Sequence, residues 1–233
     1  FPILYYALKG RFKRIWINEE FRIYAYAILL STAFLLLLTY NPSLGLEESL
    51  RHSLFQTVSL ITSAGFISFD YGEWGSSASL LLVILMFSGA MSGSTTGGLK
   101  LARVILLFKN ARNIIRKSLH PRAIIPLRFE NKIVEPRVLN NVLLVFLLYI
   151  LSFSVASLAL IGLGLGVEES AGASLSCLSN TGTGFGEIGS FGNYSFLSYP
   201  IKSILLVLMY LGRLELVTVL VLFMPSLWKK GSF

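Results

Sequence analysis

Four long apolar stretches organise the chain, and they cover residues 21–40, 79–108, 139–165 and 199–224. Crossing a hydrocarbon core of about 30 Å takes roughly 20 helical residues, so each stretch is long enough to span a bilayer. A shorter apolar segment lies between the two stretches of each pair, at residues 50–61 and 169–178. About a dozen residues cannot span, so we expect four membrane crossings and two re-entrant half-helices.

The composition agrees with a membrane protein. Of the 233 residues, 54% are hydrophobic and only 14% are charged, a balance outside the range of soluble domains. The single cysteine, Cys177, has apolar neighbours and is expected to be an ordinary buried thiol. The chain begins with Phe1 and shows no secretory signal, so we expect a piece of a longer protein or a processed form.

The net charge of +8 is distributed by side of the membrane. Basic residues precede the first crossing, fill residues 100–137 and follow the fourth crossing, whereas the alternate loops are acidic. The positive-inside rule therefore places both chain ends and the basic segment in the cytoplasm of a multi-pass cell-membrane protein. A nucleic-acid partner is not indicated, because the charge follows topology.

The basic segment, residues 100–137, changes character along its length. Its first part continues the second crossing as an amphipathic helix, and its second part reads as a loop broken by Pro121, Pro126 and Pro136. Most of it is expected to be solvated. A surface for anionic lipid or for a cytosolic regulator is the alternative that stays open.

The two halves of the chain repeat each other. Residues 85–89 align with 208–212, and residues 62–66 align with 179–183. Each half therefore has one order of elements: a crossing, a re-entrant half-helix ending in a polar glycine-containing loop, and a second crossing. Non-helical backbone at membrane depth must be buried or line a watery path. We predict an all-α integral membrane protein whose two loops line a pore.

The loops contain backbone carbonyls, hydroxyls and glycines but no carboxylate. Rings of carbonyl oxygens can replace the water of a monovalent cation, and glycine permits the dihedrals that aim them. Neutral oxygens suit potassium better than calcium or magnesium. Plain re-entrant turns with structural glycines are the alternative. The candidate ion-binding residues are Thr62, Ser63, Ala64, Gly65 and Phe66 (the first loop) and Asn180, Thr181, Gly182 and Thr183 (the second loop).

The second crossing is interrupted by a glycine-rich and polar run at residues 89–98, which predicts an unwound intramembrane loop. Such a loop beneath a filter can act as a gate, with glycines as hinges. Close helix packing through Gly89, Gly93 and Gly97 is the alternative. The candidate gating residues within and beside the loop are Gly93, Ser94, Thr95, Thr96, Gly97, Gly98 and Lys100.

Arg213 lies inside the fourth apolar stretch, where an ionisable residue points to function. We expect it to face the intramembrane loop as an electrostatic barrier to cations. A buried ion pair between crossings is the alternative. Glu215 cannot share the helix face of Arg213 at a spacing of two residues.

Several other functions are disfavoured by the sequence. Residues 184–189 match the glycine fingerprint of dinucleotide sites, but they do not follow a strand and open a helix. His52 and His120 are isolated, so no metal or catalytic cluster is visible. An intramembrane hydrolase using Ser94 lacks a base. A non-conducting membrane scaffold has no use for duplicated re-entrant loops. We therefore expect a non-enzymatic chain without a cofactor.

Four motifs together resemble the TrkH/KtrB superfamily of potassium transporters, and the TrkH branch is the nearer. They are TSAGF at residues 62–66, GSTTGGLK at 93–100, SNTGTGFG at 179–186 and LGRLE at 211–215. Thr183 stands where a typical TrkH loop has proline, which leaves the backbone form of the second loop open. The resemblance implies potassium uptake through four helix, half-helix, helix repeats, called M1-P-M2.

This chain resembles the third and fourth repeats, with the first two missing. The resemblance divides it into the end of the preceding repeat (1–20), the third repeat (21–117), a cytoplasmic basic loop (118–137) and the fourth repeat with its tail (138–233). It also implies a homodimer and a TrkA-like cytosolic nucleotide-binding partner, so a nucleotide would act only through that partner. Coupling to protons or sodium is not evident from the residues.

Overall fold

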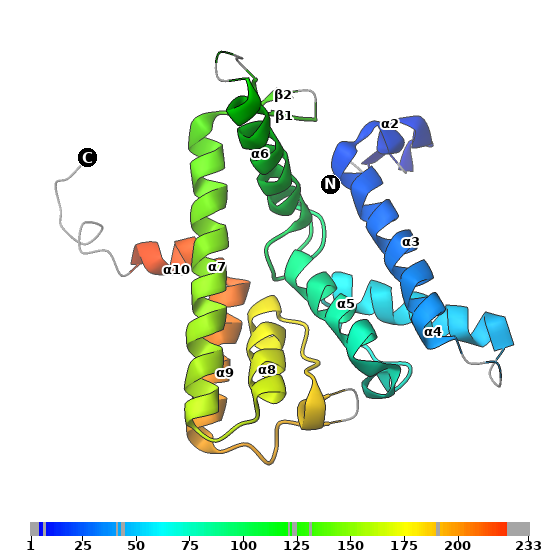
Figure 1. The fold of residues 1–233 in the computed structure, drawn as a ribbon, viewed down its shortest axis with the longest axis vertical. Coiled ribbons are helices and arrows are strands. Elements are labelled where there is room, and N and C mark those ends of the chain that lie inside the picture. The colour runs from blue at the N-terminus through cyan, green and yellow to red at the C-terminus, as the bar shows by residue number, and fades with distance from the viewer. Residues whose placement is uncertain are drawn as a thin grey trace.

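The computed structural model describes residues 5–6, 8–40, 42, 45–120, 122, 125–130, 132–189 and 192–222. The chain is mostly helical (Figure 1), which confirms the expected helical class. The elements are α2 (Phe12–Ile17), α3 (Glu19–Thr39), α4 (Gly45–Ile61), η1 (Tyr71–Trp74), α5 (Gly75–Ser88), α6 (Leu101–Leu119), β1 (Arg128–Phe129), β2 (Lys132–Ile133), α7 (Pro136–Gly162), α8 (Val167–Ser179), η2 (Gly186–Ile188), α9 (Tyr199–Arg213) and α10 (Leu216–Leu222).

Two of the described helices, α3 and α7, are long and apolar enough to cross a bilayer. Asn18 begins α3 by accepting a hydrogen bond from the Phe21 N–H at 2.7 Å, a typical N-cap. Pro136 begins α7 at a position where its missing N–H is not needed. These helices correspond to the first and third predicted crossings, within three residues at each end.

The second and fourth apolar stretches are each divided into two helices. The break between α5 and α6 was expected, and the non-helical chain runs from Gly89 to Lys100. The fourth apolar stretch, expected to form one crossing, is also divided: α9 ends at Arg213, and α10 leaves it at a steep angle (Figure 1). Glu215 has a positive φ of 61°, which ends the regular helix between them.

The core of the molecule lies around α8. This short helix packs against α7, α9 and α5 (Figure 1), and residues 172–179 are all buried. Its neighbours bring apolar side chains such as Leu160 and Leu205, and Cys177 is buried among them as expected. A Cβ on Gly172 would lie 2.8 Å from the Phe185 backbone nitrogen, so the small residue permits this close packing.

The basic segment differs in part from its prediction. The amphipathic α6 is present, but Pro136 starts a helix and does not break a loop. Two short antiparallel strands pair here, β1 at residues 128–129 and β2 at residues 132–133, with Arg128 opposite Ile133. Strands this short carry no periodicity in the sequence, so the strand pair was missed.

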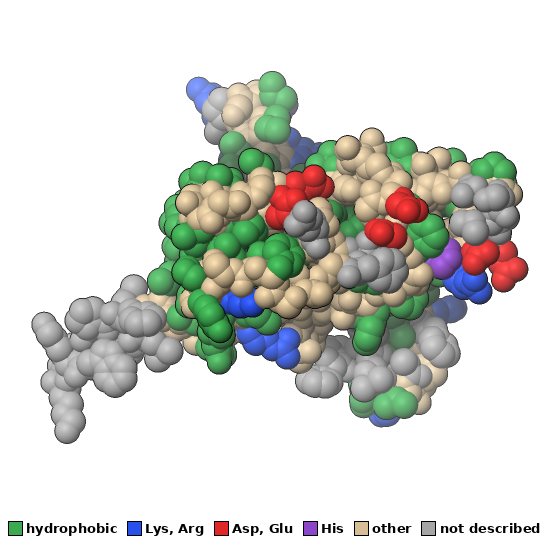
Figure 2. Space-filling view, turned by 90° about the horizontal axis from the view of Figure 1, so that it is seen from below, with side chains coloured by type: hydrophobic (Ala, Val, Ile, Leu, Met, Phe, Trp, Pro, Cys, Tyr) green, Lys and Arg blue, Asp and Glu red, His purple; other side chains and the backbone are tan. Residues whose placement is uncertain are grey.

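The acidic residues of the alternate loops gather at one end of the molecule. Figure 2 shows this end, with separate groups of acidic side chains over its surface. Glu47 and Glu48 lie in the first turn of α4, and Glu168 and Glu169 lie in the first turn of α8. Both half-helices therefore begin at this acidic end and run inward.

Candidate functional site

Both half-helices end in the same backbone turn. The Ala64 N–H donates to the Ser59 carbonyl at 2.9 Å, and the Thr181 N–H donates to the Ser176 carbonyl at 3.0 Å. These bonds reach back five residues, as in Schellman-type helix ends. The donors and the acceptors occupy matching positions in the aligned halves. The sequence repeat is therefore a structural repeat at the point where helix becomes loop.

Positive φ angles recur at two matching positions of the loops. Ser63 and Asn180 have φ of 51° and 56°, and Gly65 and Gly182 have φ of 71° and 93°. Glycine adopts this region without strain, while asparagine is one of the few other residues that enters it readily. The two glycines singled out in the sequence are therefore needed by the backbone.

The first and second loops are in direct contact. A Cβ built on Gly65 would lie only 2.0 Å from the Thr181 carbonyl oxygen, whereas a Cβ on Gly182 would meet no atom within 4 Å. Only a hydrogen on Gly65 leaves room for that carbonyl. Residues more than a hundred positions apart in the chain thus bring their backbones together at one place.

The loops are supported largely by side chains that were not predicted. Ser59 Oγ donates to the Phe66 carbonyl at 2.6 Å, and the buried Tyr71 hydroxyl donates to the Gly184 carbonyl at 2.6 Å. In the second loop, Thr181 Oγ1 is hydrogen-bonded to Ser179 Oγ at 2.8 Å. Ser63, by contrast, does not support its loop through its side chain, since its buried Oγ finds no partner among the described residues.

The intramembrane loop lies against the end of α8. A Cβ on Gly97 would lie 2.3 Å from the Ser179 carbonyl oxygen. From the other side, a Cβ on Gly212 of α9 would lie 2.0 Å from the Leu178 carbonyl oxygen. The end of α8 is therefore enclosed by two glycines, one from the intramembrane loop and one from α9.

Arg213 and the intramembrane loop are neighbours, as predicted. The Arg213 guanidinium donates to the Thr95 carbonyl at 2.7 Å, and its side chain is exposed. Among the ion pairs of the described residues, none includes Arg213. The alternative of a buried Arg213 ion pair is therefore not what the structure contains.

Glu215, two residues after Arg213, forms the ion pairs beside the intramembrane loop. Its carboxylate contacts Lys100 Nζ at 2.8 Å and Arg103 at 3.0 Å. Lys100, a candidate gating residue, thus joins the end of the intramembrane loop to the break after α9. These charged groups and Arg213 line a pocket of about 270 Å³. The pairing was missed, because Glu215 lies more than a hundred residues from both partners.

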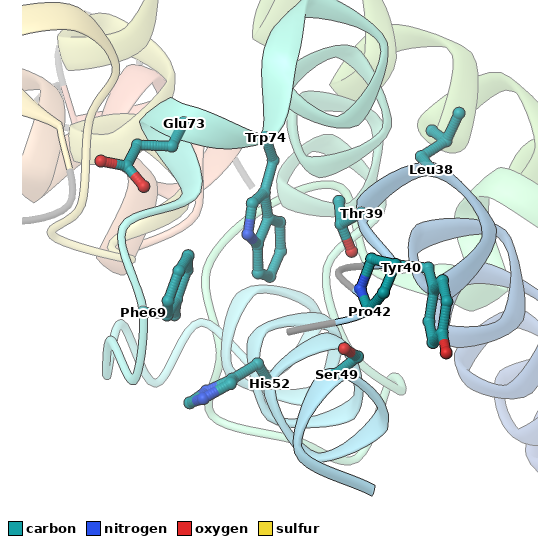
Figure 3. Close-up of a pocket in the computed structure, with 9 residues that line it drawn as sticks. All are labelled: Leu38, Thr39, Tyr40, Pro42, Ser49, His52, Phe69, Glu73 and Trp74. Carbon is teal, nitrogen blue, oxygen red and sulfur yellow. The ribbon is translucent and has the colours of Figure 1, made fainter. Parts of the chain in front are cut away.

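A second pocket, of about 320 Å³, lies near the start of α4 (Figure 3). Phe69 and Trp74 stack there with ring centroids 6.1 Å apart and planes at 18°. His52 lines it and lies 3.6 Å from Glu48. Its lining includes no residue of the first loop, the second loop or the intramembrane loop, so this pocket is separate from the candidate site.

Comparison with known proteins gives consistent matches. The family model described as "TrkH: Cation transport protein" matches residues 36–230. A Trk system potassium uptake protein TrkH from Vibrio parahaemolyticus is 34% identical over 93% of this chain and 45% of its own length. The Escherichia coli K12 protein of the same name is 32% identical over 96% of this chain and 46% of its own length.

A solved structure gives the same result in three dimensions. The crystal structure of the potassium transporter TrkH from Vibrio parahaemolyticus superposes with a TM-score of 0.90 at 30% identity. The match covers 98% of this chain and 50% of that one. The chain therefore spans about half the length of the relatives it matches.

Proposed function

Because the chain belongs to the TrkH family of cation transport proteins, we propose that it forms part of a potassium uptake pathway. The family predicted from four motifs is confirmed, and with it the membrane location and the prediction that the chain is not an enzyme. The curated relatives are named potassium uptake proteins. The observation that carries the proposal for this chain is the meeting of two matched, carboxylate-free loops at the Gly65–Thr181 contact.

The pathway is a pore of four M1-P-M2 repeats, and this chain supplies two of them. The order α3, α4, α5 and the order α7, α8, α9 support this division, since each is a helix, a second helix that ends in a loop, and a third helix. The boundaries proposed are 21–117 and 138–233, joined by the basic loop 118–137 and preceded by residues 1–20. The remaining half of a full-length protein supplies the first two repeats.

The first and second loops form half of a selectivity filter. Their backbone carbonyls coordinate potassium, with Thr62, Ser63, Ala64, Gly65 and Phe66 on one side and Asn180, Thr181, Gly182 and Thr183 on the other. Both half-helices run from the acidic end toward these loops, so the partial negative charge of each helix C-terminus faces the ion. Neutral dipoles of this kind suit a monovalent cation.

The intramembrane loop and Arg213 form the gate. Residues Gly93, Ser94, Thr95, Thr96, Gly97 and Gly98 obstruct the path, with Lys100 at the end of the loop. The bond from Arg213 to the Thr95 carbonyl supports one barrier made of loop and arginine. A cation approaching the exposed guanidinium meets a positive charge.

The acidic end of the molecule faces outward, and both termini and the basic segment face the cytoplasm. The separation of acidic and basic residues between the two ends supports this orientation. The complete protein is a homodimer, contacts membrane lipid, and binds a TrkA-like cytosolic subunit that carries the nucleotide site. Potassium is its cargo, and the chain itself holds no cofactor.

The experiment is complementation of a potassium-uptake-deficient cell by the full-length gene. Growth at low potassium, together with uptake of ⁸⁶Rb⁺ by reconstituted protein, is the expected result. A membrane scaffold predicts normal insertion without growth and without uptake. That outcome, with the protein correctly inserted, would refute the proposal.

A further inference from the structure

A buried carboxylate on α3 holds the intramembrane loop. Glu20 is only 5% exposed, and it lies in the first turn of α3. The Ser92 N–H donates to its Oε1 at 2.5 Å, and the Ser92 hydroxyl donates to its Oε2 at 2.8 Å. Hydrogen bonds to a carboxylate are stronger than those between neutral groups. Both oxygens of Glu20 are therefore used by a single residue of the loop.

In the part of the chain that the structure describes, no cation forms an ion pair with the Glu20 carboxylate. Among the described residues, its neighbour Glu19 has the ion pair, with Lys109 of α6 at 2.5 Å, and Glu20 has none. A buried carboxylate without a cation depends on its hydrogen bonds. Loss of the Ser92 contact would leave that charge unsatisfied, so the contact resists displacement of the loop.

The turn that carries Glu20 is itself fixed. Asn18 caps α3 and donates through Nδ2 to Glu130, between β1 and β2. Glu19 accepts from the Glu130 N–H at 3.3 Å as well as pairing with Lys109. Three consecutive residues thus tie the start of α3 to the strand pair, to α6 and to the intramembrane loop. These contacts fix the position of the turn that carries Glu20.

We propose that Glu20 is a positioning residue for the intramembrane loop. Through Ser92 it holds the first part of the loop on α3, while Arg213 holds the second part at Thr95. The loop is thereby attached at two points, to one helix from each half of the chain. The inference goes beyond the proposed function and relies on it only for a transport readout.

The test measures the loop directly in the full-length protein. Cys177 and any other cysteine are first replaced, and Thr95, whose side chain is exposed, is then changed to cysteine. The rate at which a water-soluble thiol reagent modifies this cysteine is measured. Glu20→Gln keeps the shape of the side chain and removes its charge. We expect it to raise the modification rate by about tenfold, the effect of a lost charged hydrogen bond, and to increase ⁸⁶Rb⁺ uptake.

The control is Glu135→Gln, which removes the charge of an exposed carboxylate that forms no ion pair among the described residues. Each carboxylate variant is combined with Ser92→Ala. The combined effect of Glu20→Gln and Ser92→Ala should be smaller than the product of their separate effects, because both act on the bond between the Ser92 hydroxyl and Oε2, whereas Glu135→Gln should leave the effect of Ser92→Ala unchanged. Multiplying effects of Glu20→Gln and Ser92→Ala would overturn the proposal.

If the Glu20→Gln variant does not reach the membrane, the modification rate of the cysteine at position 95 in the Ser92→Ala variant decides the test. A raised rate supports the proposal, and an unchanged rate overturns it. The thiol assay does not require transport. Absence of ⁸⁶Rb⁺ uptake by the parent protein would therefore refute the proposed function. The rates of thiol modification would still test whether Glu20 positions the intramembrane loop.

Discussion

The contact with Thr181 distinguishes Gly65 from Gly182, although the two glycines occupy equivalent positions in the sequence repeat. Both have positive φ, so alanine at either position carries a backbone strain of about 1–2 kcal/mol. Only at Gly65 would the new Cβ collide, at 2.0 Å from the Thr181 carbonyl oxygen. That oxygen would have to move by about 1 Å to reach the 3.0 Å below which such contacts are essentially never found.

The two substitutions should therefore differ in their effect on ion preference. Gly65→Ala moves a carbonyl that we place in the filter, and each 1.4 kcal/mol lost in the difference between potassium and sodium binding is tenfold in preference. We expect Gly65→Ala to lower the K⁺ over Na⁺ preference by at least about tenfold. Gly182→Ala should lower it by less than about threefold and act mainly on stability.

The assay is ⁸⁶Rb⁺ uptake into proteoliposomes of the full-length protein, competed by potassium and by sodium. Size-exclusion profiles and thermal unfolding of both variants serve as folding controls. An equal loss of preference in the two folded variants, or a greater loss in Gly182→Ala, would show that the carbonyl beside Gly65 does not govern selectivity. Unchanged preference in both would remove the loops from the filter.

Three further substitutions test neighbouring parts of the site. Arg213→Ala should raise ⁸⁶Rb⁺ flux, because two unit charges about 6 Å apart repel by about 3 kcal/mol at an effective dielectric of 20; unchanged or reduced flux in folded protein would contradict the barrier. Glu215→Gln leaves Lys100 and Arg103 unpaired and should lower the unfolding temperature, whereas a Glu215→Asp variant that retains the wild-type temperature would confirm the need for charge. Tyr71→Phe removes the hydrogen bond to the Gly184 carbonyl and should destabilise the protein by about 1–3 kcal/mol, seen as a melting temperature lower by a few degrees; an unchanged temperature would argue that this bond contributes nothing.

Features encoded by neighbouring residues were predictable from the sequence. The long apolar runs predicted α3 and α7, and the shorter runs predicted α4 and α8 to within five residues at their ends. The glycine-rich run at residues 89–98 predicted the break between α5 and α6 because both helix propensity and lipid exposure disfavour a helix there. Gly65 and Gly182 were identified because a backbone with positive φ needs glycine locally.

Features that depend on partners distant in the sequence were not predictable. The fourth apolar stretch looks continuous, and the break at Glu215 is accompanied by pairing with Lys100 and Arg103, which only the tertiary fold brings near. Glu20 reads as an ordinary first-turn carboxylate until Ser92 is placed beside it. The order of the elements could therefore be predicted from the sequence, whereas the contacts that hold the loops in place could not.

In the pore that we propose, the enclosure of the α8 terminus by Gly97 and Gly212 would link ion occupancy thermodynamically to the position of the intramembrane loop. The Ser179 carbonyl touched by Gly97 is two residues from the Thr181 carbonyl that meets Gly65, so a shift on one side is transmitted through very few bonds. Linkage is reciprocal: an ion whose binding favours one arrangement of the loop has its own affinity changed by the same factor when the loop moves. Filter affinity measured with the loop closed should therefore differ from that measured with the loop open.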